Sequence, residues 1–279
     1  MYLIESLSQI VTLSQQIRQS GKTLGFVPTM GALHAGHLQL LQTAQAQNDV
    51  VCCSIFVNPI QFNNAEDYHR YPRVIEADVR LLEEHQCDYL FLPAAAGMYP
   101  QPLGLSFNFG SLETVMEGRY RPGHFSGVAA VVSKLFHLVN PHKAYFGQKD
   151  LQQYAIIQRL VQDLNFNLEL VCHPIIRESD GLAMSSRNRR LNEPERREAV
   201  QLYKALQLAQ AGLPTKTVAE VKAAVAAYLR DFKHIKLEYF EIADSVSLQP
   251  VEVADGSRSL ALCIAAYLGD VRLIDNIII

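Results

Sequence analysis

Between residues 23 and 176 the sequence alternates short apolar stretches with longer amphipathic ones, and this alternation restricts the fold more than any other feature. Stretches such as VVCCSIFVN (50–58) are apolar almost throughout and rich in β-branched residues, which predicts strands buried on both faces. Repeated strand–helix units predict an α/β fold, a Rossmann-like parallel sheet with helices on both faces. The expected strands are 23–28, 50–58, 88–93, 143–147 and 167–176, and the expected helices are 36–47, 74–85, 127–139 and 150–164.

The pattern changes after about residue 176, where a polar segment leads into two amphipathic stretches near 194–212 and 216–232. Three strand-like segments follow, at 237–244, 260–268 and 271–279. Helices followed by successive strands predict a smaller C-terminal α+β domain with a mostly antiparallel sheet. We therefore expect two domains, residues 1–176 and residues 177–279.

The composition argues against several classes of protein. Hydrophobic residues make up 49% of the 279 residues and charged ones 19%, as in a folded soluble protein, and the formal charge of −3 provides no attraction for nucleic acid or an anionic membrane. The N-terminal MYLIESLSQIVTLSQQIRQS lacks the basic start and apolar core of a signal peptide. The longest fully apolar run, LALCIAAYL (260–268), is far shorter than the roughly 18 residues needed to span a bilayer. We expect neither a nucleic-acid nor a membrane partner.

The cysteines indicate a reducing compartment. An odd number of thiols in apolar strands, without any CxxC pair, is typical of reduced core residues and therefore of a cytoplasmic protein. A catalytic cysteine would need an activating histidine, and no cysteine here is bracketed by one in the sequence. The five cysteines are Cys52, Cys53, Cys87, Cys172 and Cys263.

The stretch FVPTMGALHAGH (26–37) joins an expected strand to an expected helix, at the kind of strand end where open α/β sheets bind ligands. Pro28 and Gly31 are expected to bend the chain out of the strand, while the glycines let the backbone approach a ligand at a helix N-terminus that favours phosphate. His34 and His37 could both donate to phosphate oxygens. A capped turn with two solvated histidines is the alternative, and a zinc pair is another, although no cysteine or carboxylate with ligand spacing stands nearby.

Three further polar clusters follow expected strands. FVNPIQF (56–62) offers the amides of Asn58 and Gln61, which suit a hydroxyl or carboxylate ligand, although Asn-Pro also makes a plain turn. FGQKD (146–150) places Lys149 to meet a phosphate, or forms only a capped helix with a surface lysine. DGLAMSSRN (180–188) could close over a triphosphate or be merely a solvated loop. No GxGxxG follows any expected strand, which removes the main support for a dinucleotide-dependent dehydrogenase.

Three of these clusters, FVPTMGALHAGH, FVNPIQF and DGLAMSSRN, resemble the nucleotidyltransferase superfamily, with HAGH (34–37) in the place of its HIGH signature and MSSR (184–187) in the place of KMSKS. The resemblance narrows to the pantothenate synthetase (pantoate–β-alanine ligase) family. Residues 26–188 contain six motifs in the order in which they occur in that family: FVPTMGALHAGH, FVNPIQF, YPR, EGRYRPGHFSGV, FGQKD and DGLAMSSRN. The resemblance says little about residues 190–279. Arg190 departs from the family, which usually has an aromatic residue there, and this puts the packing of its loop in question.

The resemblance implies a two-step reaction that uses ATP and Mg²⁺. ATP and pantoate would form pantoyl adenylate and pyrophosphate, with Mg²⁺ bridging the phosphates, and β-alanine would then attack the mixed anhydride to release AMP and pantothenate. Adenylation makes chemical sense because a carboxylate would have to expel oxide, a very poor leaving group. In the acyl adenylate the leaving group is a phosphate instead. The resemblance also implies a homodimer, a nucleotide- and pantoate-binding domain at 1–176, and a domain at 177–279 that acts as a lid over the unstable acyl adenylate.

The same resemblance assigns site residues. The catalytic set, which would supply donors and positive charge around the phosphates, is His34, His37, Lys149, Ser185, Ser186 and Arg187. The ATP contacts would be Met30, Gly31, Ala32, Leu33, His34, Ala35, Gly36, His37, Gly147, Gln148, Lys149, Asp150, Ile176, Met184, Ser185, Ser186 and Arg187. Gln61 and Gln153 would hold pantoate, and Gln61 would also face β-alanine. EGRYRPGHFSGV (117–128) would either line the crevice, through residues such as Arg121 and His124, or cap the helix that follows. No residue is assigned to a metal.

Two alternatives stay open. The chain could be a nucleotide-binding regulatory module without catalysis, but His37, Lys149 and Arg187 are intact, and a decayed site would lose its charged contacts first. An enzyme that performs the same adenylyl transfer on another acid or amine, such as a close analogue of pantoate, also fits the sequence.

Overall fold

The computed structural model of the chain describes residues 1–63 and 65–279, which form two compact units. Unit 1 comprises Met1–Phe109, Arg121–Gly147 and Gln153–Pro174. Unit 2 comprises Gly110–Tyr120, Gln148–Gln152 and Ile175–Ile279. Two short segments from the first part of the chain therefore belong to the second unit. The division into domains 1–176 and 177–279 stays a prediction from the sequence pattern.

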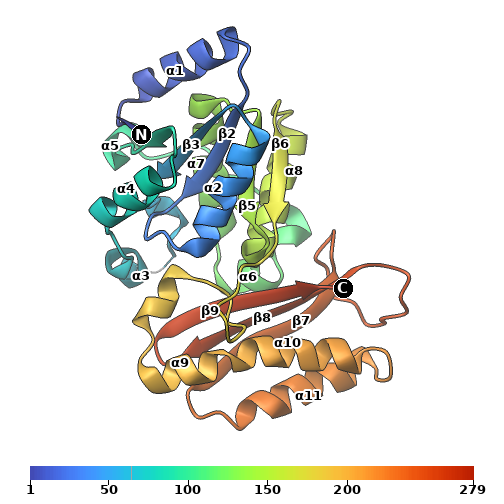
Figure 1. Cartoon of the computed structure of the whole chain (residues 1–279). Helices are drawn as coiled ribbons and strands as arrows, with labels where there is room; N and C mark the ends of the chain where they lie inside the picture. Colours follow the sequence, from blue (N-terminus) through green and yellow to red (C-terminus); the bar gives the residue numbers. More distant parts are fainter. Residues whose placement is uncertain (64) are drawn as a thin grey trace. The chain divides into compact units, whose positions relative to one another are not determined.

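Unit 1 is built on a six-stranded sheet in which every neighbouring pair is parallel, in the order β1-β4-β3-β2-β5-β6. Figure 1 labels β2, β3, β5 and β6 of this sheet. The chain runs from β2 through β3 to β4 on one side and then continues with β5 and β6 on the other. The strand order therefore reverses between β2 and β5, and ligands of open α/β sheets bind outside the carboxyl ends at such a reversal. The strands are β1 (Tyr2–Ile4), β2 (Leu24–Thr29), β3 (Val50–Ile55), β4 (Tyr89–Phe91), β5 (Lys143–Gly147) and β6 (Glu169–His173).

Helices cover both faces of this sheet, which confirms the predicted fold class. Alternate residues of β2 enter different cores: Phe26 packs in the cluster that contains residues of α1, α7 and α8, and Val27 in the cluster that contains residues of α2 and α4. The helices with residues in unit 1 are α1 (Leu7–Gln19), α2 (Ala35–Gln47), α3 (Ala65–Arg70), α4 (Ile75–Glu84), α5 (Ala95–Met98), α7 (His124–Val139) and α8 (Leu151–Asp163), with the 3₁₀ helix η1 (Pro59–Gln61).

Pro28 lies inside β2, so the prediction that it bends the chain out of the strand was wrong. It is in register with Ser54 of β3. Thr29 accepts a backbone hydrogen bond on the β3 side, so by alternation the Pro28 nitrogen faces the β5 side. There the register between β2 and β5 ends at Phe26 and Ala144, two residues earlier. The proline thus occupies a strand position at which no donor is required.

Unit 2 contains the predicted antiparallel sheet, in the order β7-β8-β9, with α10 and α11 packed beside each other against it (Figure 1). Helical structure is interrupted at Val200, so the stretch predicted as one helix near 194–212 forms two. The elements are α9 (Glu193–Ala199), α10 (Gln201–Gly212), α11 (Val218–Arg230), β7 (Ile235–Asp244), β8 (Leu260–Leu268) and β9 (Val271–Ile278). Short elements complete the unit: η2 (Gly110–Glu113), α6 (Met116–Tyr120), η3 (Gln148–Asp150) and η4 (Ser186–Arg190).

The cysteines are core residues of low reactivity. All five thiols are free, and four of them are buried. Burial raises the pKa of Cys87 and Cys172 to about 11 and that of Cys263 to about 12, so these side chains are protonated at neutral pH. Within the described part of the chain, no helix has the length and apolarity that crossing a membrane requires.

Candidate active site

The loop after β2 turns through two successive residues in the left-handed region. Gly31 has φ of 79° and Ala32 has φ of 50°, which is uncommon for a residue with a side chain. A Cβ on Gly31 would lie 3.0 Å from both an Asp78 carboxylate oxygen and the Ile55 side chain. Gly31 is therefore required by its backbone angle and by its surroundings, as a sharp turn out of β2 demands.

A buried carboxylate holds this loop in place. Asp78, on α4, is 1% exposed and accepts hydrogen bonds from the backbone N–H groups of Ala32 (2.8 Å) and Leu33 (2.7 Å). Hydrogen bonds to a charged acceptor are stronger than neutral ones, so they offset the strain of the turn. Asp78 was not among the predicted site residues. Its signal was an acidic residue on the apolar face of a helix, between Ile75 and Leu82 at helical spacing.

His34 and His37 lie against each other at the start of α2, with ring centroids 4.0 Å apart. His34 is the N-cap, and its Nδ1 accepts from the Gly36 N–H at 3.1 Å, while Nδ1 of His37 faces the His34 N–H at 3.4 Å. A ring nitrogen that accepts carries no proton, so this pattern assigns the neutral tautomer with hydrogen on Nε2 to both rings. The structure thus brings together two Nε2–H donors at a helix N-terminus, where the helix dipole favours an anion.

Gln61, the residue predicted to contact both acid and amine, lies beside Met30. Its Nε2 donates to the Met30 sulfur at 3.0 Å, and its Oε1 accepts from Asn58 at 3.1 Å. Asn58, which is 1% exposed, also donates to the Gly127 carbonyl and accepts from the Tyr99 hydroxyl at 2.9 Å. Burial raises the pKa of Tyr99 to about 12, which keeps its hydroxyl protonated as a donor. Tyr99 and Asn58 therefore fix the orientation of the Gln61 amide.

The stretch 117–128 makes structural contacts here. His124 is buried and its Nδ1 lies 2.8 Å from the Gln61 carbonyl oxygen, so it supports the backbone of Gln61. A Cβ on Gly127 would lie 2.5 Å from the Ile60 carbonyl oxygen, so a glycine is needed for α7 to approach η1 this closely. Gln153, the second predicted pantoate contact, is half-buried near the start of α8.

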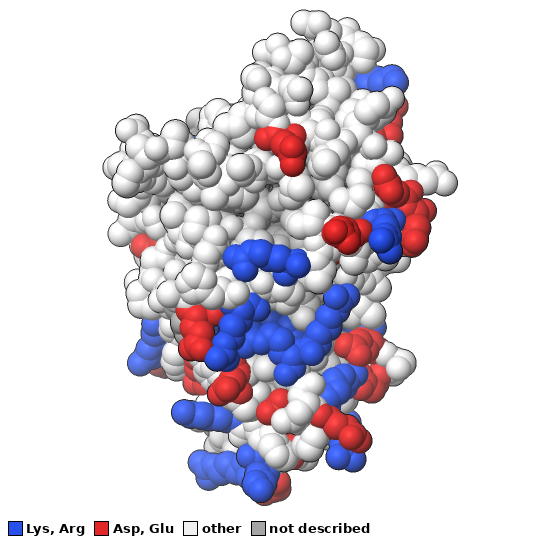
Figure 2. Space-filling model, turned by 90° about the vertical axis from the view of Figure 1, so that its left-hand side faces the viewer, with Lys and Arg blue, Asp and Glu red and all other residues white. Residues whose placement is uncertain are grey.

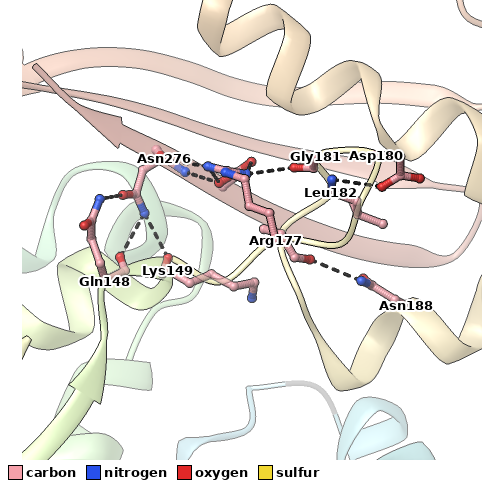
Figure 3. A network of polar contacts seen from close by, with 10 residues as sticks. Gln148, Lys149, Arg177, Asp180, Gly181, Leu182, Asn188 and Asn276 are labelled. Atoms are coloured by element: carbon pink, nitrogen blue, oxygen red, sulfur yellow. Dashed lines mark hydrogen bonds and ion pairs between the residues drawn. The ribbon is translucent and has the colours of Figure 1, made fainter. Parts of the chain in front are cut away.

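Unit 2 carries the residues of FGQKD that follow β5. Lys149 is half-buried and Asp150 exposed, and the carbonyls of Gln148 and Lys149 both accept from the side chain of Asn276 on β9 (Figure 3). Gly147, at the end of β5, would meet nothing within 4 Å if it carried a Cβ. Its neighbourhood is therefore open, and no contact inside the described part of the chain explains a glycine there.

The segment 176–190 forms a narrow hairpin that leads into η4. Met184 donates its backbone N–H to the Ile176 carbonyl at 3.0 Å, which places these two predicted ATP contacts across from each other. Ser185 caps η4 by accepting from the Arg187 N–H at 3.2 Å, and Ser186 is buried. Arg190, the departure from the family pattern, is partly buried at the end of η4.

Charge is unevenly distributed over the surface. Figure 2 shows Lys and Arg side chains gathered close together on one face, with Asp and Glu side chains around them. The short helix η4 alone carries Arg187, Arg189 and Arg190. Local positive charge of this kind suits phosphate groups although the net charge of the chain is −3.

A protein-made metal centre is not evident among residues 1–63 and 65–279. They hold no group of three or more His, Cys, Asp or Glu side chains arranged to bind an ion. His34 and His37 are close together, but no third ligand joins them in this part of the chain. The donors at this loop therefore suit phosphate oxygens better than a zinc ion.

Comparisons with known proteins match this chain to the same family over nearly its whole length. The family model described as pantoate-beta-alanine ligase matches residues 2–278. A pantothenate synthetase from Cytophaga hutchinsonii is 48% identical, with 100% of this chain and 99% of the relative covered. The crystal structure of pantothenate synthetase from Thermus thermophilus matches with a TM-score of 0.91 and 40% identity, over 99% of each chain.

One solved relative was crystallised with ligands. The pantoate-beta-alanine ligase from Francisella tularensis, complexed with beta-gamma ATP and beta-alanine, has a TM-score of 0.83 and 34% identity. The match covers 99% of this chain and 97% of that one. A full-length family match, close relatives and the fold all agree, and this chain belongs to the pantoate–β-alanine ligase family.

Proposed function

We propose that this member of the pantoate–β-alanine ligase family joins pantoate to β-alanine through a pantoyl adenylate. The overall reaction of the family is the ATP-dependent formation of pantothenate, and the proposal concerns its route and the residues that serve it. The observation that carries it is the pair of imidazole rings of His34 and His37, 4.0 Å apart at the N-terminus of α2, after a loop held by Asp78.

In the first step, a pantoate carboxylate oxygen attacks the α-phosphorus of ATP and pyrophosphate leaves. Little covalent work falls to the protein, so it acts by placing donors and positive charge on the phosphates. In unit 1, His34 and His37 are proposed to donate to phosphate oxygens. In unit 2, that role is proposed for Lys149 and for the residues of η4 and its cap, Ser185, Ser186 and Arg187.

In the second step, the amine of β-alanine attacks the acyl carbon, AMP leaves with the electron pair, and the new ammonium group loses a proton to form the amide. Gln61 is proposed to contact both pantoate and β-alanine. The amide of Gln61 is already oriented by its hydrogen bond from Asn58. Gln153 is proposed to contact pantoate. The remaining proposed ATP contacts are Met30, Gly31, Ala32, Leu33, Ala35, Gly36, Gly147, Gln148, Asp150, Ile176 and Met184.

Mg²⁺ is proposed to enter with ATP as part of the substrate, and no protein ligand to it is assigned. We also propose a cytoplasmic location, supported by the free thiols, and a homodimer, supported by the family resemblance. The role of residues 177–279 as a lid is likewise a proposal, because an acyl adenylate needs shielding from water.

Exchange of labelled pyrophosphate into ATP tests the route. With pantoate present and β-alanine absent, the adenylate mechanism predicts exchange, whereas a concerted reaction needs the amine and predicts none. A panel of small hydroxy acids in the same assay tests whether another acid is preferred. Rapid-quench detection of the adenylate in one turnover separates slow pyrophosphate release from a concerted step. No adenylate and no exchange under conditions of full ligase activity would rule out the two-step route.

A further inference from the structure

One amide side chain holds the backbone that carries Lys149. Asn276, on β9, is 3% exposed, and its Nδ2 donates to the carbonyl oxygens of Gln148 and Lys149, each at 3.0 Å (Figure 3). Its Oδ1 accepts from Nε2 of Gln148 at 3.1 Å. Both amide hydrogens and one acceptor site of Asn276 are therefore used on two successive residues.

Lys149 itself makes no side-chain hydrogen bond or ion pair with any residue from 1 to 63 or from 65 to 279. Its ammonium is near enough to Asp275 to contribute to the electrostatics of that carboxyl group. Because no direct contact fixes the ammonium, its location depends on where the backbone of Lys149 is held. Asn276 holds that backbone at two points.

Asn276 is in turn fixed through its own backbone. Its N–H donates to Asp275 Oδ1 at 2.7 Å, and its carbonyl accepts from Nη2 of Arg177 at 3.3 Å. Arg177 and Asp275 form a two-point ion pair at 2.6 and 2.9 Å, and Asp275 is 4% exposed. Burial raises the pKa of the Asp275 carboxyl and Arg177 opposes this, as in a buried pair that keeps its partners together.

The same arginine reaches the hairpin that leads to η4. Nη1 of Arg177 donates to the Gly181 carbonyl at 3.1 Å (Figure 3). The Arg177 guanidinium lies 3.7 Å from the centre of the Tyr203 ring. Gly181 has φ of 98°, and a Cβ there would come within 2.7 Å of the Tyr203 ring. Neighbouring residues of β9 thus hold the Lys149 turn directly and the 177–183 hairpin through Arg177.

We infer that Asn276 is a positioning residue for Lys149 in adenylate formation, acting through the two carbonyls that it holds. The inference rests on the proposed phosphate role of Lys149. A misplacement of about 1 Å in a group that must meet a transition state can cost roughly 100-fold in rate. Asn276 is thus expected to affect the rate of adenylation, with a smaller effect on the affinity for pantoate.

The test is a double-mutant cycle on the full chain, read by pyrophosphate exchange with pantoate and by single-turnover adenylation. Asn276→Ala should slow adenylation by about 10- to 100-fold. Asn276→Asp, nearly the same in shape, should be at least as slow, because it sets a carboxylate against two carbonyl oxygens. In a Lys149→Ala background, Asn276→Ala should add less than about 3-fold, since coupled residues are not additive.

Two further variants keep the test decisive. Asn276→Ser retains a small polar side chain and replaces the alanine variant if that one does not fold. Ile264→Val, in the buried core of β8, controls for a modest loss of stability and should keep normal adenylation. A folded Asn276 variant with normal adenylation, or an effect fully additive with Lys149→Ala, would overturn the inference. Normal adenylation by Lys149→Ala alone would overturn the proposed role of Lys149 and the inference with it.

Discussion

The loop after β2 and the turn after β5 are each held by one buried side chain, and the two side chains have opposite hydrogen-bonding character. Asp78 accepts from two consecutive backbone amides, those of Ala32 and Leu33. Asn276 donates to two consecutive backbone carbonyls, those of Gln148 and Lys149. The first device contains a buried charge, whereas the second is neutral.

Under the phosphate roles proposed for both segments, the difference shows which backbone groups each segment must keep away from the ligand. At residues 32 and 33 the backbone donors are used inside the protein, and the phosphate contacts proposed for this loop are the side chains of His34 and His37. At residues 148 and 149 the groups used inside the protein are carbonyl oxygens, which would repel phosphate. A segment that binds phosphate thus needs its donors in place. It also needs hydrogen bonds inside the protein for the backbone groups, such as carbonyl oxygens, that would repel the ligand.

The largest effect on the rate of adenylate formation is expected from a change at His37, in the loop after β2. His37→Ala should slow adenylate formation by roughly 10²- to 10⁴-fold, about 3–5 kcal/mol, the range for a positioned proton donor. The fold should persist, because His37 is only half-buried and its contact with the His34 N–H is long, at 3.4 Å. Circular dichroism checks folding and single-turnover kinetics check the rate. A folded variant with near-normal adenylation would remove His37 from the catalytic set.

Asp78→Asn tests whether the charge itself holds the loop. One amide cannot accept from both backbone donors in the same way, and its NH₂ would face one of them, so we expect a loss of roughly 2–4 kcal/mol in the free energy of unfolding. Denaturant unfolding measures it. The matched control is Asp231→Asn, the same change at an exposed residue, expected to stay within about 0.5 kcal/mol. Equal stabilities of the two variants would show that the charge of Asp78 does not hold the loop.

Gln153→Leu separates acid recognition from phosphate handling. Leucine has a similar volume but cannot accept from a pantoate hydroxyl or donate to a carboxylate, so pantoate use should fall by roughly 10- to 100-fold, about 1–3 kcal/mol. ATP binding measured without pantoate should change little. Steady-state kinetics decide. An unchanged KM and kcat for pantoate would exclude Gln153 from the site, and equal damage to ATP binding would contradict the pocket assignment.

The smallest expected effect is on the pH dependence of the unfolding free energy, through His142 beside the start of the β2–β5 pair. Burial, and then the charge of Arg18, lowers the pKa of His142, whose Nδ1 accepts from the Leu24 N–H at 2.9 Å. The folded state then binds fewer protons than the unfolded state, so this contribution is fully present above about pH 6.5 and is lost as pH falls through the lowered pKa. The dependence of the unfolding free energy on pH should become less steep in this window for His142→Asn. An unchanged slope would contradict the assignment.

The layered fold could be predicted because its signals are local. Buried strands such as β3 are apolar except for one serine, and the helices between them have a clear period. The three-residue strand β1 is too short to show a period, and α1 was considered only as a targeting signal. Pro28 was misread because its tolerance depends on where pairing with β5 stops, which only the register reveals.

The site was predictable where residues adjoin in sequence and much less so where they act across the fold. His34 and His37 lie within one motif, and the structure places them together. Asp78 and Asn276 were missed, because each holds backbone groups from a distant part of the chain. Asn276 stands in an ordinary strand pattern, VRLIDNIII, in which a polar residue reads as one that faces solvent. The roles assigned to Lys149, Ser186 and Arg187 stay predictions.

The contact between Asn276 and Gln148 also has a consequence for biosynthesis. The two residues are 128 positions apart, and a ribosome adds about 5–20 residues per second, so the amide emerges roughly 6 to 26 s after the turn that it holds. During that interval the nascent chain already contains all of the motif FGQKD, but without the partner that orders it. At the same rate Asp78 follows Ala32, 46 positions earlier, after roughly 2 to 9 s. The loop after β2 and the turn after β5 are therefore expected to become fixed at different times, and a product stalled before Asn276 would carry Lys149 on an unrestrained turn.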